Sequence, residues 1–153
     1  ERYISYFKFR EGDWVSFHPE VCNQSYRLVQ NLRDKGIKAG LALSPGVSVG
    51  YLEECLNVLD FVLIMAVNPG FAGQKMVPDH LDKIRRVRAA VSRAPHDVEI
   101  VVDGNTTLEN AKDMLRAGAS GLVTGTSSMM KEGSKGFVRL YREYCAALNG
   151  CRA

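Results

Sequence analysis

The sequence predicts an α/β fold built on a parallel β-sheet. Runs of five to seven apolar residues are typical of strands that are buried on both faces, as in a parallel sheet. These runs alternate with longer segments whose apolar residues recur at helical spacing, which indicates repeated βα units. Glycine-containing loops at residues 68–75, 103–106 and 125–128 follow predicted strands. Such loops let backbone N–H groups converge on an anion, most often a phosphate, although an ordinary tight turn explains any one of them equally well.

The predicted strands are short apolar runs bounded by polar residues or glycine. They lie at residues 14–18, 38–43, 61–67, 98–102 and 122–124. The run at 61–67 passes directly into the first glycine-containing loop. The carboxyl ends of these strands are therefore where we expect the polar site residues.

The predicted helices alternate with the strands and lie at about residues 24–35, 48–56, 78–93, 108–116 and 137–148. Leu28 and Leu32 are spaced for one helix face, and Gly36 ends that helix. Pro78 stands at the start of the third helix, in a first turn that tolerates proline. Residues 2–9 are typical of the end of another helix.

Five βα units fit two architectures. One is a five-stranded doubly wound parallel sheet, which the length of 153 residues favours because a (β/α)8 barrel needs about 250. The other is a part of such a barrel, whose first and last strands would be exposed edges. The loops follow strand ends, where barrels build phosphate sites. Periodicity alone leaves both architectures open.

Composition excludes several functional classes. The chain is 46% apolar and 24% charged, as in ordinary globular domains, and its net charge of +3 is too small to favour nucleic acid. The basic cluster at 83–93 has the spacing of a solvated helix face. No apolar run approaches the roughly 18 residues of a membrane span, and no signal-peptide pattern opens the sequence. The four cysteines lack CxxC pairing, so we expect reduced thiols and a cytoplasmic location.

Specific sequence blocks then favour the barrel. They are LSPG at 43–46, LIMAVNPGFAGQK at 63–75, VVDGN at 101–105, GA at 118–119 and GTS at 125–127. In letters and spacing they resemble the ribulose-phosphate 3-epimerase family, which includes hexulose relatives of the allulose-6-phosphate 3-epimerase type. The resemblance implies a TIM (β/α)8 barrel, of which residues 1–153 form the C-terminal part of a single domain, strands 4 to 8. The family's three opening strands have no counterpart in the sequence.

The resemblance also implies the site residues. Asp103 is implied as a metal ligand and as the acid that returns the proton, whereas its partner base belongs to a missing strand. Met65 is implied to line the metal cavity. The residues implied to hold the phosphate are Gly70, Phe71, Ala72, Gly73, Gly104, Asn105, Gly125 and Thr126.

Several alternatives remain for these residues. A carboxylate at a strand end such as Asp103 needs a metal or a helix N-terminus nearby, but a turn or capping role explains it as well. Met65 fits plain core equally well, and His18 is expected to be a site-adjacent polar residue with a structural role. Asn105, where the family has a second glycine, and Thr126 lean slightly toward the hexulose-type relatives.

The implied reaction is metal-dependent 3-epimerisation of a ketose phosphate by two-base proton transfer through an enediolate. The substrate pair is ribulose and xylulose 5-phosphate, or allulose and fructose 6-phosphate. A divalent cation (Zn, Fe, Mn or Co) would balance the developing charge. We expect a small sugar phosphate as partner, no nucleic acid, no membrane and a homo-oligomer.

The alternative function is a non-catalytic phosphate-binding partial barrel or a truncated fragment. Since only one of the implied acid/base groups is in the sequence, we expect these 153 residues alone to be inactive. Their exposed first and fifth strands are expected to associate with other chains.

Overall fold

The computed structural model describes residues 2–151 of the chain. Its sheet has five strands, β1 (Trp14–Phe17), β2 (Lys38–Leu43), β3 (Phe61–Met65), β4 (Glu99–Asp103) and β5 (Gly121–Leu122). Every neighbouring pair is parallel. The strands follow one another in space in the same order as along the chain.

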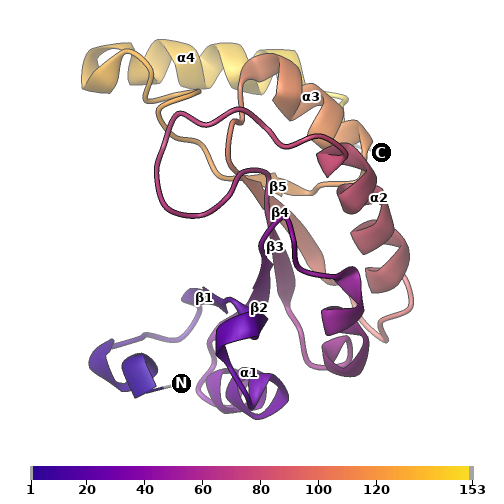
Figure 1. The fold of residues 1–153 in the computed structure, drawn as a ribbon. Helices are drawn as coiled ribbons and strands as arrows, with labels where there is room; N and C mark the ends of the chain where they lie inside the picture. The colour runs from indigo at the N-terminus through magenta and orange to yellow at the C-terminus, as the bar shows by residue number, and fades with distance from the viewer. Residues whose placement is uncertain (1, 152–153) are drawn as a thin grey trace.

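The helices lie on one side of this sheet. They are the α-helices α1 (Ser25–Arg33), α2 (His80–Val91), α3 (Leu108–Arg116) and α4 (Gly133–Leu148), with 3-10 helices η1 (Arg2–Tyr6), η2 (Pro19–Val21) and η3 (Val49–Cys55). Figure 1 shows α1, α2, α3 and α4 following a curve around the outer side of the strands. Within residues 2–151, no α-helix covers the opposite, inner side.

The strand order decides between the two architectures. A doubly wound sheet reverses its strand order at a switch point and carries helices on both faces. Here the order is strictly sequential and the α-helices lie on the outer side only. This is the arrangement of consecutive βα units in a barrel wall. The doubly wound alternative is therefore wrong.

The core lies between the outer face of the sheet and the helices. Val62 and Ile64 of β3 and Val102 of β4 are completely buried there, against helix residues such as Ile84 and Met114. Because side chains alternate along a strand, the residues between them point to the inner face. Among them, Leu63 and Val101 are only partly buried in the described chain. The inner face is thus the open face, on which a ligand can be bound.

Some predicted element boundaries are wrong. Helix α2 begins at His80 and not at Pro78, because Asp79 adopts a left-handed conformation (φ 61°) before it. Residues 49–55 form a 3-10 helix where an α-helix was expected. Strand β5 has two residues, and α4 begins four residues early, at Gly133, in a segment whose glycines obscure helical periodicity.

Two sequence-based expectations concern the edges and the thiols. Strand β1 pairs only with β2, and β5 only with β4, in the part of the chain that the structure describes. All four cysteines are free thiols in the structure. No helix among the described residues has the length and apolar character required to cross a bilayer.

Candidate functional site

Asp103 and Met65 lie side by side at the carboxyl ends of β4 and β3, where the register pairs them. Both face the inner side of the sheet and are partly buried. Burial raises the pKa of the Asp103 carboxyl, and a hydrogen bond from the Gly104 backbone N–H partly opposes that rise. The carboxyl therefore holds a proton more readily than an exposed aspartate does.

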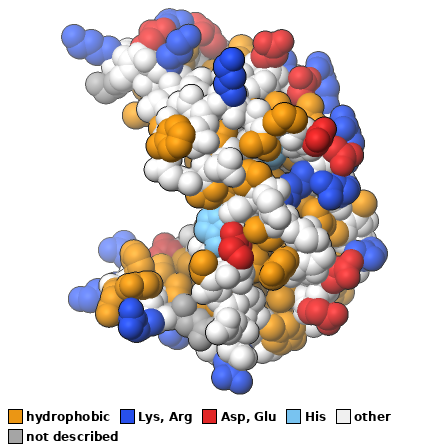
Figure 2. Space-filling view, viewed as in Figure 1, with side chains coloured by type: hydrophobic (Ala, Val, Ile, Leu, Met, Phe, Trp, Pro, Cys, Tyr) orange, Lys and Arg blue, Asp and Glu red, His pale blue; other side chains and the backbone are white. Residues whose placement is uncertain are grey.

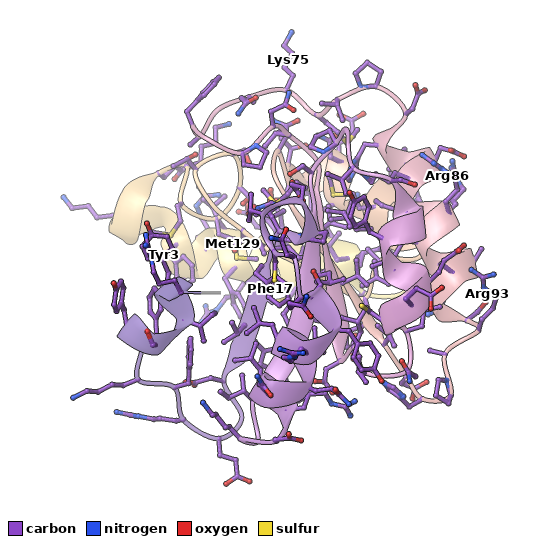
Figure 3. All side chains as sticks on the ribbon, turned by 60° about the horizontal axis from the view of Figure 1, so that its bottom comes forward. Tyr3, Phe17, Lys75, Arg86, Arg93 and Met129 are labelled. Carbon is purple, nitrogen blue, oxygen red and sulfur yellow. The ribbon has the colours of Figure 1, made fainter. Side chains whose placement is uncertain are left out.

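The loop after β3 is held together by Gln74. Its side-chain amide donates to the carbonyl oxygens of Asn68 (2.7 Å) and Phe71 (2.9 Å). Gly70 and Gly73 adopt positive φ angles of 143° and 85°, which allow this turn. The ring of Phe71 is 73% exposed, so the backbone of the loop is what the site can use. Lys75, just beyond, points away from the body of the molecule (Figure 3).

The loop after β4 requires a glycine at position 104. Gly104 has a φ of 107°, and a Cβ added there would lie 2.7 Å from Val67 Cγ2. Asn105 follows in the left-handed region (φ 49°), and its Oδ1 accepts from Met76 N (3.3 Å) and Asn110 Nδ2 (2.8 Å). This amide side chain therefore joins the second loop to the end of the first and to helix α3.

The loop after β5 is tied to the second loop by two buried hydroxyls. Thr106 Oγ1 donates to Val123 O (2.8 Å) and lies 3.4 Å from Ser128 Oγ. Ser128 Oγ accepts from Gly125 N (2.9 Å), so this N–H is used within the loop. This loop does not run directly into a helix, since α4 begins only at Gly133. The predicted site set omitted both hydroxyl residues.

The three loops and Asp103 line one cavity of about 460 Å³. Its lining includes Met65, Asp103 and every residue predicted to hold the phosphate: Gly70, Phe71, Ala72, Gly73, Gly104, Asn105, Gly125 and Thr126. Figure 2 shows the molecule hollowed on the side away from the helices. A larger cavity of about 740 Å³ lies between η1 and α1, but none of these loops reaches it.

The expected metal site is incomplete within the described chain. No group of three or more His, Cys, Asp and Glu side chains converges among residues 2–151. Catalytic metal sites use about three protein ligands. The carboxylate of Asp103 is an oxygen donor when it is deprotonated, but it supplies one ligand only. The described residues alone do not fit a metal centre.

Lys83 departs from the prediction of a solvated helix face. Arg86 on α2 and Arg93, two residues beyond its end, do point away from the sheet into solvent (Figure 3), but Lys83 is only 5% exposed. Its ammonium donates to the carbonyl oxygens of the loop after β2: Ser44 (2.6 Å), Pro45 (3.1 Å) and Val47 (2.7 Å). The composition of the helix could not show that one of its cations points inward.

His18 lies at the carboxyl end of β1 and, as expected, has a polar partner. Its Nδ1 is 3.1 Å from Ser44 Oγ and 3.5 Å from Glu20 Oε1. Ser44 Oγ in turn donates to Glu20 Oε1 (2.8 Å). The three side chains form a connected polar cluster at the ends of β1 and β2.

Comparison with known proteins shows the family to which the chain belongs. Residues 1–129 match the model of the ribulose-phosphate 3 epimerase family. Ribulose-phosphate 3-epimerase of Escherichia coli K12 is 35% identical over 127 residues, which cover 83% of this chain and 56% of the relative. The Bacillus subtilis enzyme of that name is 40% identical over 128 residues, covering 83% of this chain and 59% of the relative.

Ribulose-phosphate 3-epimerase 1 of Cupriavidus necator is 41% identical over 117 residues, covering 74% of this chain and 48% of the relative. The chain thus spans about half the length of these curated relatives. Among solved structures, a mutant tryptophan synthase alpha-subunit from Pyrococcus furiosus superposes with a TM-score of 0.63 at 17% identity, covering 92% of this chain and 55% of the other. That likeness supports the barrel-type fold alone. On the family match and these identities, the chain belongs to the ribulose-phosphate 3-epimerase family.

Proposed function

We propose that the protein containing this chain interconverts the C3 epimers of a ketose phosphate. The substrate pair is ribulose and xylulose 5-phosphate, or allulose and fructose 6-phosphate. The observation that carries this proposal is the single cavity in which the carboxyl of Asp103 meets the three glycine-containing loops. The curated relatives, which bear the name ribulose-phosphate 3-epimerase, support the same reaction class.

The loops would bind the phosphate group through the backbone. The loop at 104–105 leads into helix α3, whose N-terminal residue Leu108 follows the cap Thr107. The N-terminus of a helix favours an anion through its free N–H groups and its dipole. The positive φ angles of Gly73 and Gly104 leave the backbone of both loops open to close approach.

Asp103 would move the proton at C3. A carboxyl whose pKa is raised by burial both takes and returns a proton more readily near neutral pH than an exposed one. Epimerisation requires that the proton leaves one face of C3, giving an enediolate, and that a proton is added to the other face. A second base is therefore needed, and we propose that it comes from outside the described residues.

We propose that the reaction also requires a divalent cation. Zn, Fe, Mn or Co, with Asp103 as one ligand, would supply charge neutralisation for the enediolate oxygens. Its remaining ligands, like the second base, would come from residues outside this chain. We further propose that the protein acts in the cytoplasm as a homo-oligomer.

Turnover tests the proposal. The natural polypeptide that contains these residues is incubated with ribulose 5-phosphate or allulose 6-phosphate and a divalent metal, and the C3 epimer is measured. The expected result is epimer formation that Asp103→Asn abolishes. Phosphate binding without any turnover of either sugar would favour the non-catalytic alternative and overturn the proposal.

A further inference from the structure

We infer that His18, Ser44 and Glu20 form a second contact point for the substrate, which recognises the C1 hydroxyl at the end of the sugar remote from the phosphate. This inference rests on the proposed function. It concerns the ends of β1 and β2, whereas the cavity described above lies at the ends of β3, β4 and β5.

The register of the sheet places this cluster on the same face as Asp103. Met65 pairs with Asp103, and Ile64 pairs with Leu43, so Ser44 lies level with both Met65 and Asp103. Aligned residues of parallel strands share a face. His18 follows β1 directly. Because Phe17 pairs with Leu41, His18 lies level with Ala42, two residues below Ser44 and therefore on the same face. At the edge of the hollowed side, Figure 2 shows a histidine and an acidic side chain next to each other.

The hydrogen bonds assign a role to each ring nitrogen of His18. The single hydroxyl proton of Ser44 is donated to Glu20 Oε1 at 2.8 Å. The oxygen of Ser44 is then an acceptor for an N–H on His18 Nδ1, 3.1 Å away. In the neutral ring this leaves Nε2 as an acceptor. The side chains of His18 and Glu20 are each 33% exposed, so a ligand can reach them.

Lys83 holds the loop that carries Ser44 in position. All three of its N–H bonds are used by carbonyl groups between Ser44 and Val47. The loop that carries Ser44 is therefore attached to helix α2 as well as to β2. Preorganised side chains lose less freedom when a ligand binds, which is the property of a built contact point.

The arrangement fits one end of a ketose monophosphate. The phosphate loops follow β3, β4 and β5, and Asp103 stands on β4. A sugar held at both points directs its remaining end toward β2 and β1, across the face formed by the carboxyl ends of the strands, where barrels of this type build their sites. His18 Nε2 offers an acceptor for the C1 hydroxyl. The carboxylate of Glu20 would repel a second phosphate at that end, which favours monophosphates over bisphosphates.

The test compares a ketose 5-phosphate with its 1-deoxy analogue in the natural polypeptide. Loss of one hydrogen bond of about 1.4 kcal/mol corresponds to a tenfold weaker affinity. The unaltered protein is expected to bind the 1-deoxy analogue about tenfold more weakly than the full substrate. His18→Asn, which keeps an amide near Ser44 but reaches no further, is expected to bind the two within about twofold. Inhibition by inorganic phosphate should be unchanged.

Two further variants complete the test. His18→Gln carries its amide nearer the Nε2 position and is expected to recover part of the discrimination. His96→Asn is the matched control, because His96 bonds Leu59 O (2.8 Å) at the other end of the sheet, and it should keep the tenfold difference. If the protein is active but His18→Asn and the unaltered protein discriminate equally between the full substrate and its 1-deoxy analogue, this inference alone is overturned. Absence of any turnover overturns the proposed function instead.

Discussion

His80, at the first position of α2, makes folding sensitive to acid. It is 2% exposed, and within the described chain neither ring nitrogen has a hydrogen-bond partner. Burial, with a smaller contribution from the charge of Lys83, lowers the pKa of His80 from 6.5 to about 4. The folded state therefore keeps this imidazole neutral where the unfolded chain is already protonated.

The direction and size of the effect follow from proton linkage. Because the folded pKa is the lower one, the contribution of His80 to stability is fully present above pH 6.5 and is lost as the pH falls toward 4. Since one pKa unit corresponds to about 1.4 kcal/mol, the loss between pH 7 and pH 4 is about 3 kcal/mol. This is a large fraction of the roughly 5–15 kcal/mol that stabilises a typical domain.

Urea unfolding at pH 7, 6, 5 and 4 measures this loss. His80→Leu replaces the ring with an apolar side chain that needs no hydrogen bond, so the variant should lack that part of the acid sensitivity. His96→Asn, which removes a half-buried histidine elsewhere, should retain it. Equal loss of unfolding free energy in His80→Leu and the unaltered protein would refute the reasoning.

The other predictions concern the site. Asp103→Asn should abolish turnover. The variant should nevertheless have a higher unfolding free energy at pH 7, because the raised pKa of Asp103 means that ionisation of its carboxyl opposes folding. This gain in unfolding free energy should shrink as the pH falls through the pKa of Asp103. Gly104→Ala should destabilise by about 1–3 kcal/mol in urea unfolding, because its Cβ meets Val67, whereas Gly125→Ala, with open space around it, should change little. Gly73→Val should raise KM for the sugar phosphate more than it harms folding; an unchanged KM contradicts the phosphate assignment.

Local sequence signals were sufficient to predict the order of the elements. Apolar runs located all five strands, and glycines located the three loops, because both signals depend on neighbouring residues. The barrel itself required the resemblance, since periodicity is the same in both architectures. The predicted start of α2 was wrong because Asp79 takes a left-handed conformation, and that of α4 was wrong because two glycines weaken the helical pattern at residues 133–136.

The connections between the loops could not be predicted in this way. Asn105 bonds Met76 across 29 residues of sequence, and Thr106 meets Ser128 across 22. No periodic pattern links positions so far apart, and a hydroxyl or amide side chain has no propensity that marks a tertiary partner. The resemblance to the family therefore pointed to many of the residues that line the cavity, whereas the structure supplied the hydrogen bonds that hold the lining together.

Replacement of Lys83 tests what holds the cluster of His18, Ser44 and Glu20 in position. Lys83→Met removes the ammonium from three carbonyls, of which that of Ser44 keeps a bond from Val47 N (3.0 Å). A buried carbonyl without its donor costs about 1–3 kcal/mol, and two carbonyls lose theirs. Since the variant no longer has to bury a charged ammonium, part of this cost is offset. We therefore expect the unfolding free energy in urea to fall by about 2–4 kcal/mol. Arg86→Met, one turn further along the same helix, breaks a largely exposed pair with Asp82 and should cost about 0.5 kcal/mol or less. If the two variants lose the same free energy, the loop is held by β2 alone, and the position of Ser44, the hydrogen-bond partner of His18, does not depend on Lys83.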